Sequence, residues 1–200
     1  MIIMKYIEYL NQRHSVYALS NEEVIPDDDI TKLVGSVIEA TPSAFNSQTQ
    51  RVMILFGPRH LEFWKILMNE LQNIVPPESF PRTEAKINGF AAARGTILFF
   101  DSLDETEKLM EQFPLYKKNF ALWSQQQNGM LQENVWVALA TEGIGASLQH
   151  YNEIVKGKIE AAFGIPSGWD IIAQMPFGKI MEKPEAKPKL KLETRLIVRE

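Results

Sequence analysis

Apolar residues recur every three to four positions along much of this chain, which is the spacing of amphipathic helices. The expected helices cover residues 1–11, 27–41, 61–71, 104–112, 116–141 and 152–163. The stretch 116–141 contains no proline and would extend about 40 Å at 1.5 Å per residue. We therefore expect it to form the spine of the fold.

Continuous apolar runs predict buried strands at residues 52–56 and 95–101, the first closed by a turn at Gly57-Pro58. A third strand is expected at residues 169–175. Residues 190–198 alternate partly between apolar and polar, which predicts a further strand on a Lys- and Pro-rich arm. Three prolines interrupt residues 75–83 and predict a loop or lid there.

The chain has 200 residues, 45% of them hydrophobic, no Cys and a formal net charge of -4. One core and a single domain over residues 1–200 are expected at this size. With no Cys, no signal-peptide pattern and no apolar run of membrane length, we expect a cytoplasmic protein without membrane association. The charge argues against nucleic acid as the main partner, although residues 179–200 carry seven Lys or Arg against four Glu.

Several candidate motifs have simpler explanations. Asp27, Asp28 and Asp29 stand where a helix begins and are interpreted as its first turn, not as a metal site. Gly143 and Gly145 follow a helix and lack the third glycine of a dinucleotide loop, so they are interpreted as a helix C-terminus. No nucleophile motif or histidine pair is present. An enzyme of this composition is expected to take its chemistry from an organic cofactor.

Residues 41–51 connect a predicted helix to a predicted strand and are rich in hydroxyl and amide side chains, ending in Arg51. Such a set of donors suits an anionic polar ligand. The alternative is an ordinary turn whose Ser and Asn side chains satisfy their own backbone. The loop by itself leaves both interpretations open.

Four motifs follow one another along the chain: Arg13-His14-Ser15 with Tyr17, residues 42–48, residues 148–152, and a basic arm that reaches Arg195. In this order they resemble the FMN-dependent nitroreductase family, in particular its short branch of bacterial and fungal proteins. The resemblance covers essentially the whole chain. It implies an α+β fold with a central, mostly antiparallel sheet wrapped by helices and an extended C-terminal arm. It also implies an obligate homodimer with the long helix as its spine and one FMN at each end of the interface.

The same resemblance assigns candidate cofactor-binding residues. Those expected at the ribityl-phosphate of FMN are Arg13, His14 and Ser15, joined by Arg195 of the arm. Those expected to reach the flavin from the partner chain are Ser43, Asn46 and Gln48. Gln149 and His150 would lie along the flavin edge, where the family presents a backbone N–H to N5 and O4, and Lys86 is a candidate for the pyrimidine end.

The chain departs from the longer branch of the family at three of these places. Tyr17 stands where many relatives have Lys, and Gln149-His150 replaces a Glu-Gly pair. The terminal Lys-x-Arg pattern becomes Glu193-Thr194-Arg195, so a second phosphate cation is either missing or supplied by Lys189 or Lys191.

The function implied by the resemblance is an NAD(P)H oxidoreductase in which FMN carries the chemistry, with no catalytic side chain and no metal. Hydride would pass from NAD(P)H to flavin N5, and a nitroaromatic or quinone would then accept electrons in ping-pong order. The alternative is a flavin-binding stress-response or regulatory protein whose reductase activity is incidental. A third reading is a structural or interaction domain that uses the basic tail.

Overall fold

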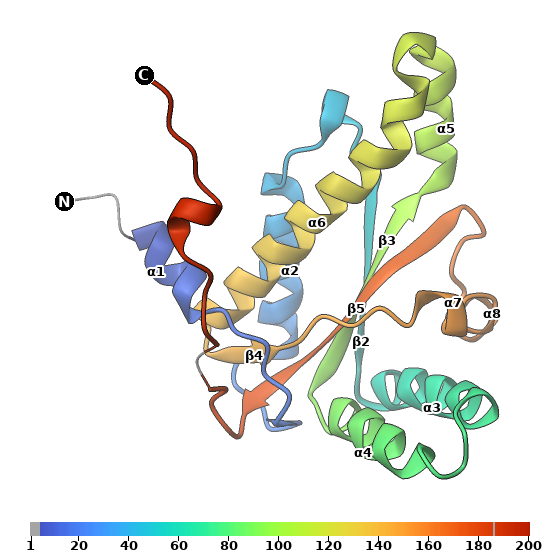
Figure 1. The fold of residues 1–200 in the computed structure, drawn as a ribbon. Helices are drawn as coiled ribbons and strands as arrows, with labels where there is room; N and C mark the ends of the chain where they lie inside the picture. Colours follow the sequence, from blue (N-terminus) through green and yellow to red (C-terminus); the bar gives the residue numbers. More distant parts are fainter. Residues whose placement is uncertain (1–4, 186) are drawn as a thin grey trace.

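A five-stranded sheet organises the computed structural model, which describes residues 5–185 and 187–200 (Figure 1). The strand order is β1-β5-β3-β2, with β4 beside β5, and every pair is antiparallel. The strands are β1 (Leu19–Ser20), β2 (Gln50–Phe56), β3 (Gly95–Ser102), β4 (Ile144–Ala146) and β5 (Trp169–Ile180). The expected α+β class with an antiparallel sheet is confirmed.

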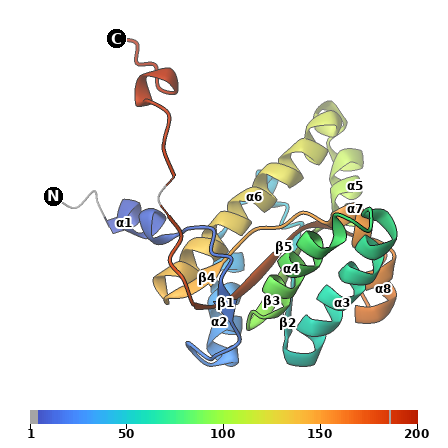
Figure 2. The same ribbon diagram turned by 60° about the horizontal axis from the view of Figure 1, so that its bottom comes forward.

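Helices cover both faces of this sheet. They are α1 (Lys5–Gln12), α2 (Asp27–Ala40), α3 (Gly57–Ile74), α4 (Phe80–Ala91), α5 (Leu103–Gln112), α6 (Lys117–Thr141), α7 (Asn152–Val155) and α8 (Lys158–Phe163). Short 3-10 turns are η1 (Ala44–Asn46), η2 (Pro114–Tyr116) and η3 (Leu192–Thr194). Figure 2 shows α3 and α4 on one side of the sheet, and α2 and α6 on the other.

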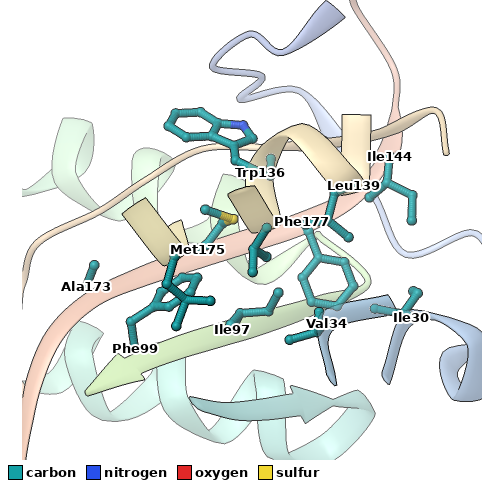
Figure 3. Packing of buried hydrophobic residues seen from close by; sticks show 13 residues of the cluster. Ile30, Val34, Ile97, Phe99, Trp136, Leu139, Ile144, Ala173, Met175 and Phe177 are labelled. Carbon is teal, nitrogen blue, oxygen red and sulfur yellow. The ribbon is translucent and has the colours of Figure 1, made fainter. Parts of the chain in front are cut away.

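Strand β3 divides the core into two layers because its side chains alternate between the two faces. Ile97 and Phe99 pack with residues of α2, α6 and β5, a layer seen in Figure 3. Leu98 and Phe100 pack on the opposite face with residues of α3 and α4. All eight residues of β3 are buried. The prediction that this apolar strand is covered on both sides is therefore confirmed.

Helix α6 is the predicted spine, and its 25 residues extend about 37 Å. It buries amide side chains as well as apolar ones. The Asn128 amide donates to the Phe100 carbonyl of β3 at 2.9 Å, and the Gln132 amide donates to the Asn128 side-chain oxygen at 2.7 Å. The first bond fastens the helix to the central strand, and the second holds the Asn128 side chain from within the helix.

Most predicted elements are present, with boundaries that differ where tertiary contacts extend or interrupt them. The N-terminal helix is described from Lys5, and its predicted start lies outside the described residues. The acidic triplet occupies the first turn of α2, as expected. Strand β5 continues to Ile180, because β4 pairs with its second half.

Three local predictions that depended on Gly or Pro were wrong. They are the turn after β2, the full length of the loop 75–83 and an uninterrupted helix over residues 152–163. Pro58 lies in the first turn of α3, where its missing N–H costs no helical hydrogen bond, so no separate turn follows β2. Pro81 has the same place in α4, so helix replaces the last part of the predicted loop 75–83. Gly157 has φ +80 and divides the predicted helix 152–163 into α7 and α8.

Gly143 and Gly145 have different roles, contrary to the shared one predicted for them. Gly143 has φ +76 just after α6, so it does end that helix. Gly145 lies in β4, where an added Cβ would come within 2.9 Å of a Leu19 methyl group and 2.7 Å of Ile180. The second glycine therefore permits close packing of chain segments.

The predicted strand at residues 190–198 is absent, and this part of the arm contains only the single turn η3. The arm leaves the body of the protein and lies away from the sheet (Figures 1 and 2). Leu190 is 75% exposed and Ile197 is 72% exposed. An alternating pattern forms a strand only beside a partner strand, and the described part of the chain offers none here.

We predict opposite effects for two Gly→Ala changes. In Gly178→Ala the new Cβ would meet the Ser20 carbonyl oxygen and lie 2.9 Å from the Arg94 nitrogen, both backbone atoms that cannot swing aside. This overpacking should lower the free energy of unfolding by about 1–3 kcal/mol. Gly129→Ala, on an exposed helical position with open space around it, should raise it by about 0.5–1 kcal/mol. Urea unfolding of both variants measures the two values, and equal effects would contradict the assignment.

Candidate functional site

The segment after α1 forms one wall of a hollow of about 390 Å³. Arg13, His14 and Ser15 line it from one side, and the arm lines it from the other with Lys187 and Lys189. Three cationic residues thus line one concavity, together with the acidic Glu185. Lys189, one of the two residues proposed to replace the cation missing from the pattern at residues 193–195, lines this hollow.

Two residues of α6 orient Arg13. Its guanidinium lies 4.5 Å from the centre of the Trp136 ring, and its Nε lies 3.2 Å from a Glu133 carboxylate oxygen. The ion pair meets the distance criterion, but the buried Nε makes no hydrogen bond of acceptable angle in the described part of the chain. The indole N–H of Trp136 is likewise buried without a partner among the described residues. Unsatisfied donors of this kind are expected where a ligand or an ordered water is missing.

Ser15 is joined to the strand that follows α6. It forms a parallel bridge with Ala146 of β4, and the neighbouring Val16 N–H donates to the Ala146 carbonyl at 2.9 Å. The chain then continues to Gln149 and His150. The sheet therefore brings the Arg13 motif and the Gln149 motif to the same edge, although more than a hundred residues separate them.

Gln149 and His150 are presented differently. Gln149 is 7% exposed, and its N–H and C=O both pair with Gln174 of β5, at 2.7 and 2.9 Å. His150 is exposed, and its N–H donates to no acceptor within the described residues. Of the two backbone N–H groups, that of His150 is the one available to a ligand.

Lys86 and Tyr17 are linked to this edge through aromatic rings. The Tyr17 ring lies 6.4 Å from that of Phe90 on α4, and the Lys86 ammonium lies 5.6 Å from the same ring. The ammonium also lies 5.5 Å from the ring of Tyr151, which follows His150. Both side chains are largely exposed.

The loop that carries Ser43, Asn46 and Gln48 lies elsewhere in the protomer. Its backbone contacts Gln127 of α6, whereas Arg13 contacts that helix at residues 133 and 136, so the two anchor points are six to nine residues apart. That spacing corresponds to about 9–14 Å along the helix. Figure 1 shows the two segments at separate places along α6. Within one protomer, this loop does not complete the hollow around Arg13.

Arg195 is also not brought to Arg13. It follows η3 in the exposed part of the arm, beyond the lysines that line the hollow. Within the described residues it has no ion-pair partner.

Sequence reasoning missed the buried polar residues that hold this region together. Gln127 is 2% exposed and bonds to the 43–48 loop, and Asp101 is 1% exposed beneath it. Burial raises the pKa of Asp101, and hydrogen bonds from Thr49 and Thr106 oppose that rise. The only sequence signal was the run of three Gln residues in the middle of the long helix.

The buried histidine has a structural explanation. The ring of His60 bonds the Thr96 hydroxyl at 2.8 Å and the Ala91 carbonyl at 3.1 Å, and burial lowers the pKa of His60. In the described part of the chain, no group of His, Cys, Asp or Glu residues could hold a metal ion. No described helix has both the length and the apolar character needed to cross a bilayer.

Comparison with known proteins agrees with the geometry. Residues 10–179 match the model of the nitroreductase family. HBN1 of Saccharomyces cerevisiae is 33% identical over 196 residues, which cover 97% of each chain. The nitroreductase CinD of Lactococcus lactis, solved with nicotinic acid, has a TM-score of 0.92 at 36% identity and covers 98% of this chain and 100% of its own.

A more distant structure, a nitroreductase of Desulfitobacterium hafniense with bound FMN, shares the fold at 17% identity, with a TM-score of 0.71 and 97% of each chain covered. The antiparallel sheet, the long helix and the cationic hollow thus occur in a chain whose family match spans most of its length. This chain belongs to the nitroreductase family of oxidoreductases.

Proposed function

We propose that this protein is an FMN-dependent NAD(P)H oxidoreductase that reduces nitroaromatic or quinone acceptors. The observation that carries the proposal is the hollow lined by the cations Arg13, Lys187 and Lys189, together with one acidic residue, Glu185. Such a set of cations fits a phosphate group. Family membership supports the reduction of nitro compounds as the reaction class.

The residues present fit FMN. The phosphate would be held by Arg13, which contacts Glu133 through its Nε and stacks over the ring of Trp136. The buried, unpaired indole N–H of Trp136 is a further donor next to this position. His14 and Ser15 would reach the ribityl chain.

The flavin ring would lie along the sheet edge. There the free N–H of His150 would donate to the N5 and O4 side, with Lys86 toward the pyrimidine end. Tyr17 would close the site beside Phe90. Bound FMN supplies hydride acceptance from NAD(P)H and electron transfer to a second substrate, which makes ping-pong kinetics the expectation.

Complexes of a relative support flat aromatic acceptors. CinD of Lactococcus lactis has been solved with chloramphenicol and with 4-nitrophenol, each with a TM-score of 0.90 to this chain. In this chain the exposed aromatic surface at the site is provided by Tyr17. Acid-base side chains are not required by this proposal, because solvent can supply the protons.

A homodimer would complete the site. Ser43, Asn46 and Gln48 lie on a loop that does not line the hollow around Arg13, and we assign them to the flavin of a partner chain, as the family resemblance implies. The exposed apolar residues of the arm support the same assembly, because Leu190 and Ile197 find no apolar surface in one protomer. A paired arm would also carry Arg195 to a phosphate.

We predict that Arg13→Ala weakens FMN binding about tenfold or more, because a charge-assisted hydrogen bond to phosphate is lost. Flavin absorbance of the purified protein and fluorescence of released FMN measure the change. Arg59→Ala is the control, since Arg59 lies on α3 in an exposed pair with Glu62. A variant that stays yellow with full FMN occupancy would contradict the role of Arg13.

We predict parallel double-reciprocal plots when NADH or NADPH is varied at several fixed concentrations of menadione or a nitroaromatic. A shared face over one flavin requires the nicotinamide to leave before the acceptor enters. Anaerobic bleaching of the flavin band by either nicotinamide is the direct check. Retention of FMN without reduction by either one would favour the flavin-binding regulatory role.

We predict complementation between two defective chains. Arg13→Ala and Gln48→Ala should each lower FMN occupancy as homodimers of about twice the 22.9 kDa chain mass. A mixed dimer has one site with both changes and one site with neither, so about half of its sites should bind FMN normally. If Gln48 instead served its own protomer, both sites of the mixed dimer would be defective.

A further inference from the structure

The loop around η1 has an unusual backbone. Phe45, Asn46 and Gln48 have φ values of 58, 52 and 49, all in the left-handed region. Asn tolerates this conformation, whereas Phe and Gln rarely adopt it. A strained loop keeps such a shape only when its surroundings hold it.

Aromatic residues hold the loop from one side. The Phe45 ring stacks on Trp123 at 5.7 Å and lies 5.0 Å from Phe113 and 5.5 Å from Phe120. These rings come from α6 and the end of α5. They fix the side chain of Phe45 while leaving it 49% exposed.

Gln127 holds the loop from the other side. Its amide oxygen accepts the Ala44 N–H at 3.0 Å, and its amide nitrogen donates to the Ser47 hydroxyl at 3.1 Å and the Thr49 hydroxyl at 2.6 Å. One side chain therefore bonds both the beginning and the end of the strained segment.

The chain of bonds continues into the core. The Thr49 hydroxyl donates to one carboxylate oxygen of Asp101 at 2.6 Å, and the Thr106 hydroxyl donates to the other at 3.0 Å. The cavity lined by Thr49, Thr106 and Gln127 is too narrow for a water molecule. A dry hydrogen-bond network strengthens its members and penalises the loss of any one of them.

We propose that Gln127 is a positioning residue that holds residues 43–48 in a preformed shape, so that Asn46 and Gln48 meet the flavin without reordering. The proposal rests on the assignment of this loop to FMN in the proposed function. Preformed geometry raises affinity because the cost of ordering the loop is not incurred on binding. Gln125 and Gln126, next to it on α6, are exposed, so the helix itself provides a matched comparison.

The test compares Gln127→Met with Gln126→Met in the purified FMN-loaded protein. Met has a similar length and flexibility but cannot replace the amide bonds. We expect the apparent FMN affinity of Gln127→Met to be about tenfold weaker than that of the wild type. The fluorescence of FMN released on dilution measures this affinity. Gln126→Met should match the wild type. Saturating FMN should restore kcat of Gln127→Met, because the residue acts on the loop and not on the reaction.

Hydrogen exchange supplies a second readout. The Ala44 amide, bonded to Gln127, and the Gln48 amide, bonded to the Ser43 hydroxyl at 3.0 Å, should exchange faster in Gln127→Met but not in Gln126→Met. Ser47→Ala removes only the hydrogen bonds between the Ser47 hydroxyl and the Gln127 amide, at 3.1 and 3.3 Å, and should show the same changes in weaker form. This variant keeps the test decisive if Gln127→Met does not fold.

Unchanged FMN affinity and unchanged loop exchange in the folded variants would overturn the proposal. Faster loop exchange with wild-type FMN affinity would also overturn it, because Gln127 would then be structural only. Failure of the wild-type protein itself to bind FMN would instead contradict the proposed function. The two failures are therefore distinguishable.

Discussion

The fold depends on hydrogen bonds to the polar side chains that helix α6 buries. Gln127, Asn128 and Gln132 are at most 7% exposed in the middle of this helix, and a buried amide without partners would be strongly unfavourable. They find partners in the 43–49 segment, in the β3 carbonyl of Phe100 and in one another. Neighbouring residues of one helix therefore fix it on the sheet, through Asn128, and fix a loop from a distant part of the chain, through Gln127.

Because α6 is rigid, it also sets the distance between the two halves of the candidate site. Gln127 bonds the polar loop, and Glu133 and Trp136 orient Arg13. A straight helix cannot bring these positions closer than about 9–14 Å. The polar loop and Arg13 therefore lie at separate places along one helix, and the proposed dimer would join the loop of one chain to the hollow of the other.

The C-terminal arm exposes apolar side chains that the rest of the described chain does not cover. Lys187 and Lys189 reach the hollow, but Leu190 and Ile197 remain in solvent beyond them. Exposed apolar side chains on an extended segment gain free energy when another surface covers them. The arm thus combines a local cationic role at its base with an apolar tip suited to a neighbouring chain.

The sequence by itself determined the elements that depend on local pattern: the apolar run of β3, the acidic start of α2 and the proline-free length of α6. The order of motifs also indicated the family. Local pattern does not determine which residue of the Gln125 to Gln127 run is buried. Only the tertiary structure decided this. The Gln127 amide donates a hydrogen bond to the Thr49 hydroxyl, which lies 78 positions away along the chain. Periodicity is a property of neighbouring residues, whereas burial and hydrogen-bond partners are fixed only when distant segments meet.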